Sequence, residues 1–206
     1  EESERKGCEM YVQIGRGAGP RHHAYDRSKL EPQMLMYIKN LDMDAIRKDE
    51  DGVKAICLPD ERWLHVDIKT TNLIPNILAQ TKAEKKFAYS AILFRDDICT
   101  EGACSNVFVM KDEICYTHPA DNKILKGITR QMILTRVAPS IGVTVIEKEF
   151  DRAFVEDADE LFFTDTIGGV IPITKLERNV VGDGKPGKVT KRLQESLNKL
   201  MEEGLP

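Results

Sequence analysis

The sequence predicts an α+β protein. Short apolar stretches of strand-like alternation occur beside stretches with helical periodicity, and the polar turns at residues 95–97 and 111–113 join consecutive strands directly. Such hairpin connections differ from the strict strand–helix alternation of a parallel sheet. With 206 residues, 41% of them hydrophobic, the chain can bury a core without disulfide support.

The first elements are a strand, a loop and a connector. Alternation predicts a strand over Met10–Ile14, and glycine and proline predict a loop over residues 15–20. The charged stretch at residues 45–52 reads as a connector, so we expect two domains, 1–48 and 49–206.

The next segment contains two strands and a helix. Residues 53–59 are apolar, and residues 63–69 alternate, which predicts a second strand that ends at Lys69. A helix follows, with Asn72 as its cap and Pro75 in its first turn. Its inward face is expected to contain Ile74, Ile77, Leu78 and Thr81.

The rest of the chain continues the mixture. Strands are predicted over residues 87–94, 106–111 and 114–119 as a meander, and then over residues 143–150, 161–166 and 170–177. A helix that starts at Ile128 should turn Met132, Ile133, Val137 and Ala138 inward. A last amphipathic helix should end near Gly204 and bury Val189, Leu193, Leu197, Leu200 and Met201.

Charge and cysteine usage exclude several classes of partner. The formal net charge is only −4 and both signs are interspersed, so we expect no nucleic-acid or membrane partner. The start of the chain, EESERKG, is unlike a signal peptide, and no apolar run reaches the roughly 20 residues of a membrane span, which predicts a cytoplasmic location. The five cysteines lack metal-ligand spacing, so we expect buried free thiols and no metal site.

Lys69 is the first group that could do chemistry. A lysine at the end of a buried strand loses hydration, which lowers the pKa of its ammonium group and exposes a nucleophilic amine. The alternative is a lysine whose head group reaches outward to solvent.

Two further stretches, LKGITR and CTEGACSN, could bind a ligand. Gly127 permits close approach, and the free N–H groups at Ile128 and Thr129 suit a phosphate, although many helices begin in this way. Glu101 precedes a glycine at a strand end, where a solvated turn carboxylate is the alternative.

The stretch GRGAGPRHHAY places Arg16, Arg21 and His23 around a loop that could hold a carboxylate, or that could simply be an exposed basic loop. Taken together, a lysine, a carboxylate and a phosphate cradle match the needs of pyridoxal phosphate. An amine bonds its aldehyde, a carboxylate keeps its ring nitrogen protonated, and backbone donors hold its phosphate.

Five motifs in the order GRGAGPRHHAY, DERWLHVDIKTTNLIPN, ILFRDDICTEGACSNVFVMKD, YTHPADNKILKGITRQ and VIPI…GDGKPGKVT resemble the D-amino acid aminotransferases of the fold-type IV class of pyridoxal-phosphate enzymes. The resemblance covers nearly the whole chain. It implies a D-amino acid aminotransferase-like fold with a pseudo-barrel, flanking helices and, in residues 1–48, a remnant of a smaller N-terminal domain. It also implies transamination between D-amino acids, such as D-alanine, and 2-oxo acids.

The resemblance assigns roles to individual residues. Lys69 matches the Schiff-base lysine that also shuttles the α-proton, and Glu101 matches the acid that pairs with the pyridine nitrogen. Arg21 and His23 match the pair that receives the substrate carboxylate, often across a homodimer interface. The matched cofactor contacts are Arg62, Gly127, Ile128, Thr129 and Thr166 at the phosphate, with Leu125 on one ring face.

Several features depart from the family pattern. Tens of residues that precede the first strand in family members, with a phosphate-binding arginine, have no counterpart before Met10. Ala103 and Cys104 replace part of a serine run, and Asp165 stands beside Thr166, where its charge would repel a phosphate unless it turns away. A branched-chain aminotransferase, an aminodeoxychorismate lyase and a catalytically silent cofactor-binding chain therefore stay as alternatives.

Overall fold

A computed structural model of the chain describes residues 7–24 and 30–204. Contacts within the chain form two compact units, Glu1–Ile46 and Arg47–Pro206. The assignment of residues 1–48 and 49–206 to two domains stays a prediction.

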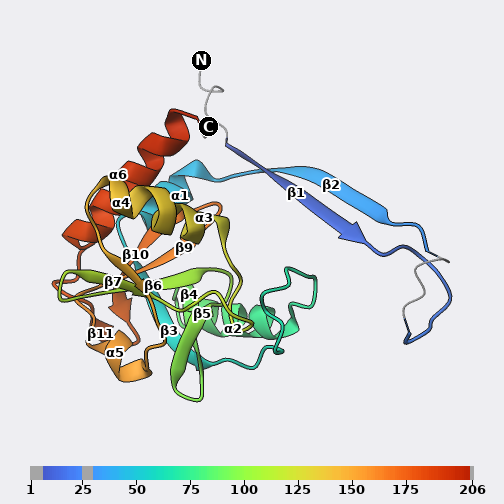
Figure 1. Ribbon diagram of the computed structural model, residues 1–206, viewed down its shortest axis with the longest axis horizontal. Helices are drawn as coiled ribbons and strands as arrows, with labels where there is room; N and C mark the ends of the chain where they lie inside the picture. The colour runs from blue at the N-terminus through green and yellow to red at the C-terminus, as the bar shows by residue number, and fades with distance from the viewer. Residues whose placement is uncertain (1–6, 25–29, 205–206) are drawn as a thin grey trace. The chain divides into compact units, whose positions relative to one another are not determined.

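The first unit is an antiparallel two-stranded ribbon, shown in blue in Figure 1. Strand β1 (Cys8–Gly15) confirms the predicted strand, and it pairs with β2 (Gln33–Asn40), which the sequence pattern did not predict. The five consecutive residues 34–38 are apolar, so they lack the alternation by which a half-buried strand is recognised. All eight residues of β2 are exposed, and alternating apolar residues of β1 are exposed as well.

The connector expected at residues 45–52 is partly helical. Helix α1 spans Met43–Asp49, and the Asp42 carboxylate accepts a hydrogen bond from Ala45 N at 3.0 Å. This contact caps the first turn and stabilises a helix that charge density alone did not reveal.

A nine-stranded mixed sheet forms the second unit and curls into a half-barrel. The strand order is β5-β4-β3-β10-β9-β6-β7-β8, with β11 beside β10. The strands are β3 (Val53–Pro59), β4 (Ser90–Arg95), β5 (Ile98–Gly102), β6 (Asn106–Lys111), β7 (Ile114–Thr117), β8 (Val145–Glu147), β9 (Glu160–Asp165), β10 (Gly169–Leu176) and β11 (Asn179–Val180).

This order corrects the predicted meander. The turn at residues 95–97 joins β4 to β5, a strand that the prediction treated only as the approach to Glu101. Strand β6 then pairs with β7 and β9, while β3 is parallel to both β4 and β10. The α+β class and the pseudo-barrel are confirmed.

Alternating side chains build a core on each face of the sheet. On β6, Val107 and Val109 join one cluster, whereas Phe108 and Met110 join another, which packs against the helices after residue 128 and at the C-terminus. Two stacked rings, Phe108 and Phe162, lie 4.8 Å apart between their centroids and belong to this second cluster.

Helix α2 (Ile74–Lys85) is present, but its predicted face is wrong. The buried residues are Ala79 and Ala83, whereas Ile74, Ile77 and Leu78 are exposed. Small alanines allow the helix to approach the sheet closely, and two inward amide side chains bind strand carbonyls: Asn76 donates to Ala103 O at 2.7 Å and Gln80 to Tyr89 O at 2.8 Å. The N-cap is Leu73 rather than Asn72.

The segment before α2 is also corrected. Residues 63–69 alternate in polarity, yet they form bends and turns rather than a strand. Their position depends on isolated contacts with Asn122, whose carbonyl accepts from Val66 N at 3.0 Å and whose side chain donates to Leu64 O at 2.8 Å. Trp63, Leu64 and Ile68 are exposed.

The two remaining predicted helices are confirmed. Helix α3 (Ile128–Met132) continues through the π-helical turn η2 (Ile133–Val137) into α4 (Ala138–Ser140). Of the residues predicted to face inward, Ile133, Val137 and Ala138 are buried and Met132 is half-buried. Helix α6 (Lys188–Glu202) buries Leu193 and Leu197 but leaves Met201 exposed. The short helix α5 (Arg152–Glu156) was not predicted. Among the described residues, no helix is long and apolar enough to cross a membrane.

Candidate active site

Glu101 lies in β5 and is only 4% exposed, so the reading of this residue as a solvated turn carboxylate is wrong. Three donors hold its carboxylate. Arg62 Nη1 donates to Oε1, while Asn106 Nδ2 and Leu125 N donate to Oε2 at 2.7 and 3.0 Å. A buried carboxylate with this many donors is fixed in place, and it can face a cationic ligand group without reorganising.

Arg62 has contacts that the family resemblance did not imply. Besides Glu101, its guanidinium donates from Nε to Asp60 Oδ1 and from Nη2 to Asp60 Oδ2, both at 2.9 Å, and from Nη2 to Lys123 O at 3.2 Å. Arg62 is buried, and its donors point at two carboxylates and a carbonyl instead of at an open anion site. These contacts indicate that Arg62 supports Glu101, and its match to a phosphate-binding arginine stays a prediction.

The charges in this cluster alter its proton affinities. Burial raises the pKa of Glu101 to about 7, and the Arg62 guanidinium and the N–H of Leu125 oppose the rise. Burial acts in the same direction on Asp60, but its hydrogen bonds with Arg62 outweigh burial and hold the pKa of Asp60 at about 2. Glu101 can thus change its charge near neutral pH, whereas Asp60 stays ionised and balances Arg62.

Leu125 and Gly127 lie next to Glu101. The Leu125 carbonyl accepts from Asn106 Nδ2 and from Gly127 N, both at 2.8 Å. Gly127 precedes α3 with extended backbone angles, and a Cβ on it would lie 2.2 Å from Asn106 Oδ1. Glycine is therefore required here by the close approach of the Asn106 side chain.

The helix start at Ile128 and Thr129 and the turn at Thr166 are brought together. Thr129 is buried, and its hydroxyl donates to Asp165 O at 2.8 Å, which ties α3 to the end of β9. Ile128 and Thr166 are exposed. The two stretches matched to phosphate contacts thus adjoin each other, and the first N–H groups of the helix have no intrahelical acceptor.

The Asp165 carboxylate turns toward its own turn and a tyrosine. Its Oδ1 accepts from Ile167 N at 2.9 Å and from Gly168 N at 2.6 Å, and its Oδ2 accepts from Tyr89 at 3.2 Å. These contacts stabilise the turn between β9 and β10 and leave the negative charge beside the region expected to hold a phosphate.

Lys69 is exposed in the single chain, which corrects the expectation that it faces a dehydrated interior. The reason is local, because residues 63–69 form no strand and all of them except half-buried Val66 are exposed. Its charge nevertheless acts on Cys104: partial burial and Asp165 raise the pKa of that thiol, and Lys69 opposes them. Lys69 thus acts electrostatically on a residue of the turn that follows Glu101.

Arg21 and His23 are exposed in the loop after β1, within the first unit. The backbone of this loop is described only to residue 24, where the Ala24 carbonyl lies 3.1 Å from His22 Nδ1. Their role toward a substrate carboxylate stays a prediction.

Three cysteines match the expectation of buried free thiols. Cys57, Cys99 and Cys115 are buried, whereas Cys8 and Cys104 are exposed, and all five are free. A group of possible metal ligands, which the sequence did not indicate, is formed by His118, Asp121 and Glu149. Lys123 Nζ lies 2.5 Å from Glu149 and 3.8 Å from Asp121, so an ammonium group already supplies the positive charge there.

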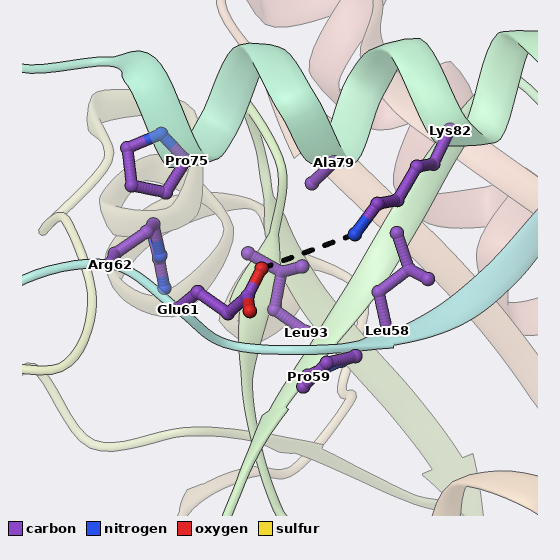
Figure 2. A pocket seen from close by; sticks show the side chains of 8 residues that line it. All are labelled: Leu58, Pro59, Glu61, Arg62, Pro75, Ala79, Lys82 and Leu93. Atoms are coloured by element: carbon purple, nitrogen blue, oxygen red, sulfur yellow. Dashed lines mark ion pairs between the residues drawn. The ribbon is translucent and has the colours of Figure 1, made fainter.

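A small pocket lies between α2 and the segment that leaves β3 (Figure 2). It is lined by Leu58, Pro59, Glu61, Arg62, Pro75, Ala79, Lys82 and Leu93. Figure 2 shows the ion pair between two of these residues, Lys82 on α2 and Glu61 on the segment after β3, and the distance between Nζ and Oε2 is 4.0 Å. The pocket includes none of Lys69, Glu101 and residues 127–129. We therefore base the candidate site on the Glu101 cluster, which contains the buried ionisable groups.

Sequence reasoning missed two important side chains, Asp60 and Asn106. Asp60 follows a predicted strand and resembles an ordinary turn residue, and Asn106 begins β6 without any distinctive spacing. The only available signal was an Asn at the start of an otherwise apolar strand, where a buried amide needs partners.

Comparisons with known proteins agree on one family. The model of the family described as amino-transferase class IV matches residues 1–176. D-alanine aminotransferase of Staphylococcus epidermidis is 40% identical over 193 residues, which are 94% of this chain and 68% of that protein. D-alanine aminotransferase of Bacillus licheniformis is 38% identical over 202 residues, 98% of this chain and 70% of that protein.

Solved structures share the fold at lower identity. A branched-chain amino acid aminotransferase solved with pyridoxamine 5′-phosphate has a TM-score of 0.79 at 24% identity and covers 97% of this chain and 66% of that one. A putative 4-amino-4-deoxychorismate lyase from Legionella pneumophila also has a TM-score of 0.79, at 23% identity, over 92% and 69% of the two chains. This chain thus spans about two thirds of the length of its relatives, and it belongs to the class IV aminotransferases, a family of pyridoxal-phosphate enzymes.

Proposed function

We propose that this chain takes part in pyridoxal-phosphate-dependent transamination between a D-amino acid, such as D-alanine, and a 2-oxo acid. The buried Glu101 carboxylate carries the proposal, because it is held by Arg62, Asn106 and the N–H of Leu125 beside a helix start suited to a phosphate. The 40% identity to a D-alanine aminotransferase favours the D-amino acid branch.

The residues present fit pyridoxal phosphate. Glu101 would face the ring nitrogen, and Leu125 would pack on the ring. Ile128, Thr129 and Thr166 would hold the phosphate at the start of α3 and the adjoining turn. Two buried hydroxyls at strand ends near this region, those of Ser105 and Thr164, have no hydrogen-bond partner among the described residues. Unpaired buried hydroxyls leave donors available to a polar ligand.

When bound, the cofactor supplies an electrophilic aldehyde and a ring that accepts electrons. Lys69 Nζ would bond the aldehyde carbon and, once released by the substrate amine, accept the α-proton at the same nitrogen. Its charge acts on the thiol of Cys104, three residues after Glu101, which supports this role. Because Lys69 is exposed in the single chain, ligand or partner surface would cover it during the reaction.

Glu101 would stabilise a protonated ring nitrogen. Its pKa of about 7 in the free chain means that a cation opposite the carboxylate would favour the ionised form. Arg62 would keep the carboxylate oriented, and its own charge is balanced by Asp60.

Arg21 and His23 would bind the α-carboxylate of the substrate, and the family resemblance places this contact across a homodimer. Exposed apolar side chains on α2, such as Ile74 and Ile77, support self-association. The branched-chain and lyase alternatives have weaker support, because those structures are below 25% identity.

A catalytically silent cofactor-binding chain is a second candidate, because Lys69 is exposed and the chain spans about two thirds of its relatives. Reduction with borohydride after incubation with pyridoxal phosphate, followed by peptide mapping, tests whether Lys69 bonds the cofactor. We expect the adduct on Lys69, its loss in K69A and its retention in K82A, which removes an exposed lysine from α2. An adduct spread over many lysines, unaffected by K69A, would refute the enzyme proposal.

A further inference from the structure

We infer that Asn106 is a positioning residue of the proposed site: its side-chain amide ties the Glu101 carboxylate to the backbone of residues 125–127. The separation between the group that faces the ring nitrogen and the start of α3 is then fixed by one side chain. This inference rests on the function proposed above, because the two ends of the tie are the two ends of the expected cofactor site.

The amide group of Asn106 uses both of its hydrogens within this site. Nδ2 donates to Glu101 Oε2 at 2.7 Å and to Leu125 O at 2.8 Å, and the residue is only 4% exposed. Glu101 Oε2 also accepts from Leu125 N at 3.0 Å. Three hydrogen bonds therefore close a ring that joins β5, β6 and the segment before α3.

The ring extends to Gly127 through contact and hydrogen bonding. Leu125 O accepts from Gly127 N at 2.8 Å, and a Cβ on Gly127 would lie 2.2 Å from Asn106 Oδ1. The amide oxygen thus packs on the last residue before α3 while the amide nitrogen holds Glu101. A shift of Asn106 would move both together.

The side-chain chemistry makes asparagine specific at this position. Two acceptors, Glu101 Oε2 and Leu125 O, each need a hydrogen, and the hydroxyl of a serine has only one to donate. An ionised aspartate would donate none and would repel Glu101. Glutamine adds a methylene group, which would displace the amide from the place that it occupies between Gly127 and Glu101. If Asn106 served only to stabilise the start of β6, its contacts with Glu101 and Leu125 would not be needed.

Thr117 provides a matched control for such a structural role. It is 1% exposed on the neighbouring strand β7, and its hydroxyl donates to Val107 O at 2.8 Å. The T117V variant removes one buried hydrogen bond from the same sheet but none from the Glu101 cluster. Loss of stability alone therefore cannot distinguish N106A from T117V, whereas the titration of Glu101 can.

The test uses the full chain without cofactor, labelled with ¹³C at the glutamate carboxyls, with the Glu101 resonance assigned by its loss in E101Q. The starting point is a titration midpoint of about 7. Because a hydrogen bond to an ionised group favours that form, we expect N106A to raise the midpoint by about one pH unit. N106S, a milder change for use if N106A fails to fold, should raise it less, and T117V should leave it unchanged.

A second measurement follows cofactor binding through the fluorescence of Trp63, the single tryptophan of the chain. We expect N106A and N106S to weaken pyridoxal-phosphate binding about tenfold or less, in the order of their effect on Glu101, and T117V to leave it unchanged. An unchanged Glu101 midpoint in a folded N106 variant, or an equal shift in T117V, would overturn the inference. If wild type forms no adduct at Lys69, the proposed function fails, while the titration still decides whether Asn106 controls Glu101.

Discussion

Glu101 depends on its surroundings for its charge, and this dependence should be visible in stability. Its pKa is raised to about 7 in the folded chain, so the folded state keeps a proton that the unfolded chain loses above its ordinary value of 4.5. The free energy of unfolding should therefore fall as the pH rises from about 4.5 to 7, on the order of 3 kcal/mol for a shift of this size.

Urea unfolding of wild type and E101Q across this pH range measures the effect. E101Q cannot ionise, so its stability should lack this downward slope. E61Q, at an exposed glutamate, is the matched control and should follow wild type. Parallel slopes for wild type and E101Q would mean that Glu101 is not desolvated as described.

Arg62 should act on stability as well as on the cofactor. Its side chain is 3% exposed and pairs with Asp60 and Glu101, so R62M leaves buried Glu101 without a counter-charge and leaves buried Asp60 with Arg95 alone, 3.2 Å away. We expect R62M to lower the free energy of unfolding at neutral pH by about 3–5 kcal/mol. R152Q, which removes a half-exposed ion pair with Glu156, should cost under about 1 kcal/mol. If Arg62 instead served only to bind the phosphate, R62M would weaken phosphate binding and leave the free energy of unfolding almost unchanged.

At the same scale, the sequence predicted some residues well and others poorly. Glu101 was identified by its motif, and the structure adds that it is buried. The pairing of Arg62 with Asp60 was missed because it depends on the course of the chain after β3, which no local pattern encodes. The shielding expected of Lys69 failed because it depended on a strand that does not form.

The orientation of α2 is the clearest consequence at the scale of elements. Ala79 and Ala83 are buried, while Ile77 is 60% exposed. Replacement of Ala83 by leucine should overpack the interface with the sheet and lower the free energy of unfolding by about 1–3 kcal/mol. I77S should change it by less than about 1 kcal/mol, measured by urea unfolding at a protein concentration too low for self-association. A larger loss of stability in I77S than in A83L would mean that the face of α2 with Ile77 is the buried one, as the sequence predicted.

Other elements show why periodicity succeeds or fails. The helix from Ile128 and the helix that buries Leu193 and Leu197 were predicted because each has one apolar stripe packed on the sheet. In α2, the apolar residues follow a helical period but face outward, because Asn76 and Gln80 hydrogen-bond inward. Hydrophobic periodicity thus shows which residues share one face of a helix, but the contacts of the helix determine whether that face packs against the sheet.

At the scale of the whole molecule, a group of exposed apolar side chains indicates a surface that a second molecule can cover. Ile74, Ile77 and Leu78 are 70%, 60% and 52% exposed on one face of α2. We predict that the chain self-associates at micromolar concentration and that I77E shifts its sedimentation velocity toward the monomer. K85Q, at an exposed lysine on the same helix, should leave the distribution unchanged. A monomer in wild type would remove the homodimer from the proposal.

The central claim is that this chain transfers the amino group of a D-amino acid. The most direct test is a single turnover in which the chain, loaded with pyridoxal phosphate, is mixed with D-alanine or with L-alanine and the 2-oxo acid formed is measured. The account predicts one equivalent of pyruvate per bound cofactor from D-alanine, little from L-alanine and none from K69A. Pyruvate from L-alanine alone would contradict it, and so would the absence of pyruvate from a sample that holds pyridoxal phosphate at Lys69 and has not been treated with borohydride.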